Sequence, residues 1–139
     1  MINLAKNVKF KNDRKTVLLV DDDSDFLLQQ KAMLEQAGFT VLQAESEAAA
    51  EALLNEHRPD LAVLDVMMEK MDAGFVLSHR IKKSDPSIPV ILITSVSSET
   101  GLDFDTATDE ERSWIKADAL LAKPVRFEQL TREINRLLK

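Results

Sequence analysis

The chain has 139 residues, of which 45% are hydrophobic and 30% charged, and its formal net charge is −6. This length and composition are typical of one globular domain with a hydrophobic core, and the lack of cysteine excludes disulfides and thiolate metal sites. No apolar stretch reaches the ~20 residues of a membrane span and the N-terminus lacks a secretory signal, so we expect a cytoplasmic protein without membrane contact.

The charge is unevenly distributed along the chain. Residues 1–15 contain five lysines and arginines and one aspartate, a net charge of +4, which leaves −10 for residues 16–139. We interpret residues 1–15 as a basic, flexible lead-in and residues 16–139 as the folded domain. Because phosphate contacts need a basic surface, the acidic domain excludes nucleic acid as a direct partner.

Five short apolar runs predict β-strands, at residues 16–20, 39–44, 60–66, 89–95 and 117–123. Four of them are continuous and rich in Val, Ile and Leu, which is typical of strands buried on both faces of a parallel sheet. The run 39–44 is weaker, and we expect it nearer the edge of the sheet.

Segments with helical spacing of apolar residues separate these runs. The face of the first helix is predicted to comprise Phe26, Gln30, Met33 and Ala37, with Gly38 at the helix end. Further helices are expected over 46–57, 75–83, about 108–116 and about 126–138. The last of them has the clearest apolar stripe, formed by Phe127, Leu130, Ile134, Leu137 and Leu138. This alternation of strands and helices predicts an α/β fold with a parallel sheet.

Charged and hydroxyl residues stand where the predicted strands end. Aspartates 21–23 follow the first strand, Asp65 ends the third, Thr94 the fourth and Lys123 the fifth. Ligands of such sheets bind at the carboxyl ends of the strands, so we expect these side chains to converge at one edge.

The residue types at this edge indicate a chemistry. Clustered carboxylates suit Mg²⁺, while a lysine and a hydroxyl supply the charge and the donor that a phosphoryl group needs. An aspartate between them can act as a nucleophile toward phosphorus. The residues therefore predict Mg²⁺-assisted phosphoryl transfer. Asp23 is expected mainly to begin the first helix, with Asp23 or Ser24 as its N-cap.

Four motifs occur in a characteristic order: "VLLVDDD", "LAVLDVMM", "VILITS" and "LLAKPV". Together they resemble the receiver domain of two-component response regulators, over about residues 16–139. The resemblance implies a flavodoxin-like, doubly wound (βα)5 fold with a five-stranded parallel sheet of order 2-1-3-4-5. The chain ends at the last predicted helix, so we expect a single-domain response regulator or a domain of a longer protein.

The resemblance also implies roles for individual residues. Asp65 matches the phospho-accepting aspartate, and Asp21 and Asp22 match the acidic pair that holds Mg²⁺ together with Asp65 and the backbone carbonyl of Met67. Thr94 matches the switch hydroxyl that turns toward the phosphoryl group. Lys123 matches the lysine that pairs with that group, and the family commonly has a cis peptide between it and the following proline.

The function implied is that of a phosphoryl acceptor and signalling switch rather than an enzyme. A sensor histidine kinase or phosphotransfer protein would phosphorylate Asp65, adding roughly −1.5 to −2 charges. The added charge would repack the face formed by the fourth helix, fifth strand and fifth helix of the family fold. A downstream protein would bind that face, which could also form a phosphorylation-dependent homodimer.

The sequence departs from the family pattern at several positions. Glu69 replaces a proline, "DAG" at 72–74 replaces "DG", and Leu120 replaces an aromatic that moves with the threonine. For Trp114, in a longer than usual stretch before Lys123, core packing is expected, with a switch or docking role as the alternative. Met67 and Val96 match positions that in the resembled family tune dephosphorylation. Both side chains are apolar and cannot orient an attacking water, so they predict a long-lived phosphoryl group.

Three other functions are alternatives to this one. A pseudo-receiver would keep the fold as a docking module without phosphorylation. A small phosphatase resembling haloacid dehalogenases would use Asp21 and Asp23. Such an enzyme needs a further acidic pair after the lysine, and this chain has only Glu128 and Glu133 there, on a predicted helix. An EF-hand fails because Phe26 and Ala32 replace the required glycine and glutamate. His57 and His79 have no partner at metal-ligand spacing and are expected at the surface or its boundary.

Overall fold

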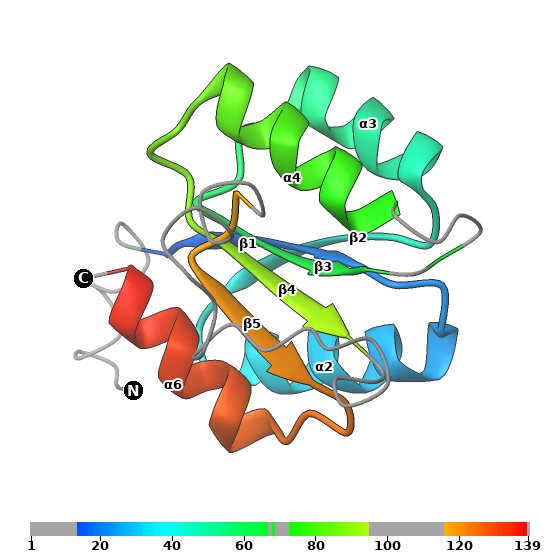
Figure 1. Ribbon diagram of the computed structural model, residues 1–139. Coiled ribbons are helices and arrows are strands. Elements are labelled where there is room, and N and C mark those ends of the chain that lie inside the picture. Colours follow the sequence, from blue (N-terminus) through cyan, green and yellow to red (C-terminus); the bar gives the residue numbers. More distant parts are fainter. Residues whose placement is uncertain (1–13, 67, 69–72, 95–115, 139) are drawn as a thin grey trace.

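The computed structural model describes residues 14–66, 68, 73–94 and 116–138. Five parallel strands form one sheet in the order β2-β1-β3-β4-β5 (Figure 1). The strands are β1 (Thr16–Val20), β2 (Thr40–Ala44), β3 (Leu61–Asp65), β4 (Val90–Thr94) and β5 (Ala119–Ala122). The predicted strand order is confirmed, and so is the position of residues 39–44 at an edge.

Helices cover both faces of this sheet, as a doubly wound fold requires (Figure 1). One face packs against α2 (Ser24–Gln36) and α6 (Phe127–Leu137), and the other against α3 (Glu47–Glu56) and α4 (Ala73–Ser84). The predicted helix at about 108–116 falls outside the described residues. Within those residues, no helix has the length and apolarity needed to cross a membrane.

Alternate residues of each strand enter opposite halves of the core. Leu19 and Ile93 lie in the layer shared with α2 and α6, while Leu18, Leu64 and Leu92 lie in the layer shared with α3 and α4. All five are at most 1% exposed. Burial on both faces is the physical reason why these strands are continuous apolar runs, since each buried Leu or Ile contributes about 1.5–3 kcal/mol.

The two ends of α2 are set by local sequence signals. Asp23 is the N-cap, because its carboxylate accepts hydrogen bonds from the backbone N–H groups of Asp25 and Phe26, at 3.0 and 3.2 Å. At the other end, Gly38 has a φ of +103°, and the N–H of Phe39 donates to the carbonyl of Leu34. Both the cap and the glycine-terminated end confirm the predictions.

The buried face of α2 differs from the predicted one. Only Gln30 of the predicted set is buried, and its neighbours on that face are Leu27 and Leu34. Ala37 is exposed, because the helix ends there and the chain turns away toward β2. On α6 the predicted stripe is confirmed, with Leu130 and Ile134 fully buried.

Candidate functional site

The carboxyl ends of β1, β3, β4 and β5 bring four predicted residues to one edge of the sheet. Asp21 directly follows β1, Asp65 and Thr94 are the last residues of β3 and β4, and Lys123 directly follows β5. The Lys123 Nζ lies 3.4 Å from the Asp21 Oδ2 and 3.6 Å from the Asp65 Oδ2. The predicted convergence of these side chains is therefore confirmed.

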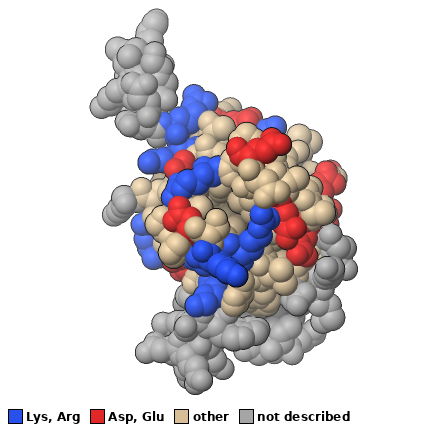
Figure 2. Space-filling model, turned by 90° about the horizontal axis from the view of Figure 1, so that it is seen from above, with Lys and Arg blue, Asp and Glu red and all other residues tan. Residues whose placement is uncertain are grey.

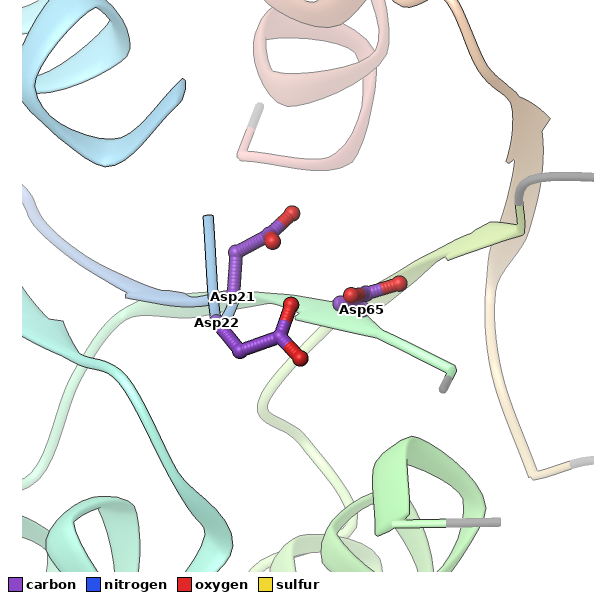
Figure 3. A group of neighbouring side chains, drawn as sticks. All are labelled: Asp21, Asp22 and Asp65. Carbon is purple, nitrogen blue, oxygen red and sulfur yellow. The ribbon is translucent and has the colours of Figure 1, made fainter. Parts of the chain in front are cut away.

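Three carboxylates form a cluster at this edge. Asp21, Asp22 and Asp65 each offer one oxygen, and these oxygens lie within 4.8 Å of one another. Figure 3 shows the three side chains reaching into the same space from the ends of two neighbouring strands. Asp21 and Asp65 are 1% and 3% exposed, whereas Asp22 is exposed. Hard oxygen donors with one side open to water fit Mg²⁺, which keeps several of its waters.

Among the described residues, one oxygen of the Asp21 carboxylate accepts a hydrogen bond and the other does not. Its Oδ1 accepts a hydrogen bond from the backbone N–H of Asp23 at 2.9 Å. Its Oδ2 is buried and accepts no hydrogen bond from the residues that the structure describes, and the Lys123 ammonium group at 3.4 Å is the cation that compensates it among them. A buried carboxylate oxygen with unused acceptor capacity is strongly unfavourable by itself, and this oxygen fits a cation ligand.

Lys123 is the positive group of the cluster. Burial by itself lowers the pKa of Lys123, but the nearby carboxylates of Asp21 and Asp65 outweigh this effect and hold the pKa above its ordinary value. The ammonium group also lies 6.0 Å from the centroid of the Phe26 ring, at the edge of cation–π range. The lysine is therefore charged at neutral pH and ready to pair with an anion.

Backbone contacts place Thr94 beside Lys123. The N–H of Lys123 donates to the carbonyl of Thr94 at 2.7 Å, and Thr94 is 5% exposed. The peptide between Lys123 and Pro124 is cis, as predicted. Leu120, the replacement for the family's aromatic, is partly buried against the layer of α3 and α4.

In the sequence, Gly74 stands out only as the last residue of "DAG" at 72–74, and its role in packing was not predicted. Its N–H donates to the carbonyl of Val66 at 2.9 Å, so the first turn of α4 lies against the end of β3. A Cβ at Gly74 would lie 2.6 Å from the Val66 Cα and would meet the carbonyl oxygen of Asp65. A glycine near the start of a helix after a strand is a weak signal for such an approach.

Several residues for which the sequence predicts a role lie outside the described residues. They are Met67, Glu69, Val96 and Trp114. The two histidines, His57 and His79, are both exposed, which confirms their expected place at the surface. Among the described residues, the carboxylate cluster holds neither of them.

Comparison with known proteins agrees with this geometry. A family model described as "Response regulator receiver domain" matches residues 17–135. Protein PilH of Pseudomonas aeruginosa is 32% identical over 127 residues, which cover 88% of this chain and 96% of PilH. The heme response regulator HssR of Staphylococcus saprophyticus is 35% identical over 126 residues, and the match spans 89% of this chain but only 51% of HssR.

Solved structures show the same fold. The structure of a CheY-like response regulator receiver domain protein from Methanospirillum hungatei matches with a TM-score of 0.74 and 27% identity, covering 90% of this chain and 94% of that one. A receiver domain from Clostridium thermocellum matches with the same TM-score and identity over 89% and 94% of the two chains. The chain belongs to the family of response regulator receiver domains of two-component systems.

Proposed function

We propose that this receiver domain accepts a phosphoryl group on Asp65 and works as a signalling switch. The observation that carries the proposal is the position of the Lys123 ammonium group between Asp21 and Asp65, beside a cluster of three carboxylates. Receiver domains typically bind Mg²⁺ at such a cluster. Here the ligands would be Asp21, Asp22, Asp65 and the backbone carbonyl of Met67.

The reaction uses the chain's own groups in distinct roles. A carboxylate oxygen of Asp65 attacks phosphorus, an O–P bond forms, and the bond between phosphorus and the donor breaks, with its electron pair leaving on the donor. The bound ion supplies charge neutralisation for the approaching phosphoryl oxygens. Lys123 pairs with one phosphoryl oxygen, and the Thr94 hydroxyl donates a hydrogen bond to another.

The donor in this proposal is a sensor histidine kinase or a phosphotransfer protein of the cytoplasm. Phosphorylation of Asp65 adds roughly −1.5 to −2 charges at a nearly buried position. The added charge draws Thr94 inward and repacks the face that the fourth helix, fifth strand and fifth helix form in the family fold, to which β5 and α6 of this chain correspond. A downstream protein target binds this face, which also offers a surface for a phosphorylation-dependent homodimer.

Intact-mass measurement tests the phosphorylation directly. The protein is incubated with Mg²⁺ and a small phosphodonor such as acetyl phosphate, and we expect the mass of one added phosphoryl group. Asp65→Asn and an excess of chelator should each abolish the adduct. Asp25→Asn removes an equal charge from an exposed position on α2 and should leave the adduct unchanged.

Absence of an adduct with small phosphodonors and with histidine kinases would contradict the proposal. The pseudo-receiver, a docking module of the same fold without phosphorylation, would then be the better description. An adduct that persists in Asp65→Asn would place the phosphoryl group on another residue.

A further inference from the structure

The inner side of α4 makes specific contacts near both ends of the helix. Gly74, Ser78 and Lys82 are four residues apart, so they form one row that spans about 12 Å along the helix. Gly74 and Ser78 are buried, and Lys82 is partly buried. Figure 2 looks onto the opposite, outer side of α3 and α4, where Lys and Arg side chains reach the surface. The row therefore joins α4 to the interior of the protein.

At its first turn, α4 is fixed to the end of β3. The N–H of Gly74 donates to the carbonyl of Val66 at 2.9 Å, and no Cβ fits between Gly74 and the backbone of Asp65. Asp65 is only 3% exposed, so a phosphoryl group on its carboxylate adds volume and charge at a nearly closed position. A displacement of the Asp65 backbone also displaces the first turn of α4, because a close-packed interior has no free space to absorb it.

One turn further along α4, Ser78 holds the chain just before β5. The Ser78 hydroxyl donates a hydrogen bond to the carbonyl of Lys116, and Ser78 is fully buried. Lys116 has a φ of +60°, and among the described residues it is the only one besides glycine with a positive φ. This left-handed conformation is unfavourable for a residue with a side chain and persists where neighbouring contacts hold it. The hydrogen bond from Ser78 is such a contact.

In the next turn, Lys82 contacts the residue that leads into β5. The Lys82 Nζ lies 2.8 Å from the Asp118 Oδ2, which also accepts a hydrogen bond from the N–H of Val90 at 2.8 Å. The N–H of Asp118 in turn donates to the carbonyl of Val90 at 2.8 Å. Two hydrogen bonds thus hold Asp118 on β4, and the long side chain of Lys82 can follow a small movement of α4. Such a movement therefore acts on Lys116 rather than on Asp118.

We propose that α4 relays phosphorylation of Asp65 to the chain before β5, and that Lys116 is the two-state element that responds. In the unphosphorylated protein, Ser78 holds Lys116 in the left-handed conformation. Phosphorylation displaces the first turn of α4, the hydrogen bond from Ser78 weakens, and Lys116 relaxes to a conformation that residues with side chains prefer. The new backbone direction at Lys116 redirects the chain that leads into β5. This inference rests on the proposed phosphorylation of Asp65.

NMR spectra of the ¹⁵N-labelled full chain test the relay, and the intact mass of the same sample reports the adduct on Asp65. With Mg²⁺ and acetyl phosphate, we expect the amide signals of Ala117 and Asp118 in the wild type to move. Lys116→Gly removes the strain, because glycine adopts the left-handed conformation readily, and should reduce this movement about twofold or more. Lys116→Ala keeps the strain at the same exposed position and should respond like the wild type.

Ser78→Ala releases Lys116 without phosphorylation. Before the phosphodonor is added, the signals of Ala117 and Asp118 in this variant should already lie toward their positions in the phosphorylated wild type, and the phosphodonor should move them little further. The adduct should still form, because Ser78 is not part of the carboxylate cluster. The matched control is Ser84→Ala, which removes a hydroxyl from the exposed end of α4 and should behave like the wild type.

Two results, each with the adduct present, would overturn the relay and leave the proposed function intact. One is an equal movement of the Ala117 and Asp118 signals in Lys116→Gly and Lys116→Ala. The other is a Ser78→Ala variant whose signals begin at the wild-type positions and move as far as those of the wild type. Absence of the adduct in the wild type would overturn the proposed function, and this inference with it.

Discussion

The α-carbon of Gly74 lies so close to the backbone of Asp65 that no side chain fits between them. A Cβ at this position would meet the carbonyl oxygen of Asp65 and would approach the Asp65 carbonyl carbon to 2.8 Å. The N-terminal turn of α4 is thereby packed directly behind the proposed phospho-acceptor. We expect a side chain at this position to displace Asp65 relative to Asp21 and Lys123.

Gly74→Ala tests this close packing, because helix propensity and overpacking predict changes of opposite sign in the free energy of unfolding. Helix propensity alone predicts that alanine in place of a helical glycine stabilises the protein by about 0.5–1 kcal/mol. Overpacking of the added methyl group against the backbone of Asp65 and Val66 predicts instead that the protein loses about 1–3 kcal/mol of stability. We expect the loss in urea unfolding, together with slower phosphorylation of Asp65. A stabilised variant with normal phosphorylation would contradict the packing argument.

Lys123 should contribute stability that depends on pH. Its folded pKa lies above the unfolded value of about 10.4, so its contribution is complete below that pH and is lost as the pH rises through the folded pKa. At about pH 8, Lys123→Met should be about 1–3 kcal/mol less stable than the wild type, because Asp21 and Asp65 lose their cation. The difference should shrink as the pH rises through the folded pKa of Lys123, above the unfolded value of about 10.4.

Urea unfolding at a series of pH values measures this difference. Lys83→Met is the matched control, since Lys83 is exposed and forms no ion pair in the described part of the chain. A pH-independent difference for Lys123→Met would mean that packing of its aliphatic chain, rather than its charge, supports the site.

Mg²⁺ should stabilise the folded protein through the carboxylate cluster. At about 100 times its dissociation constant, an ion that binds only the folded state adds about 2.7 kcal/mol. Asp22 is exposed, so Asp22→Asn should fold normally and lose most of this gain. Asp25→Asn removes the same charge from the first turn of α2 and should keep the stabilisation by Mg²⁺. Thermal unfolding with Mg²⁺ or with chelator distinguishes the two variants.

Asp23 should support helix α2 rather than the metal ion. Asp23→Ala removes the acceptor for the N–H groups of Asp25 and Phe26 and should cost about 1 kcal/mol. Asp23→Ser, which can cap in the same way, should recover most of that loss. Both variants should retain the stabilisation by Mg²⁺, and a loss of the Mg²⁺ response in both would assign Asp23 to the metal site.

The sequence by itself determined the architecture and the set of residues at the site. Strands buried on both faces must be continuous apolar runs, and such runs can be recognised in the sequence without knowledge of the elements that pack against them. The cap at Asp23 and the turn at Gly38 depend only on nearby backbone groups, so they too could be predicted locally. Asp21, Asp65, Thr94 and Lys123 follow from their places at strand ends and from the family motifs.

Tertiary structure alone decided the details that depend on contacts between distant segments. The buried face of α2 follows from its angle on the sheet, which places Leu27 and Leu34 inward. The close approach of Gly74 to Asp65 and the hydrogen bond from Arg80 to Asn55 arise where α4 meets other elements. No local pattern encodes these relationships, because each is a distance between atoms that the chain brings together only by folding.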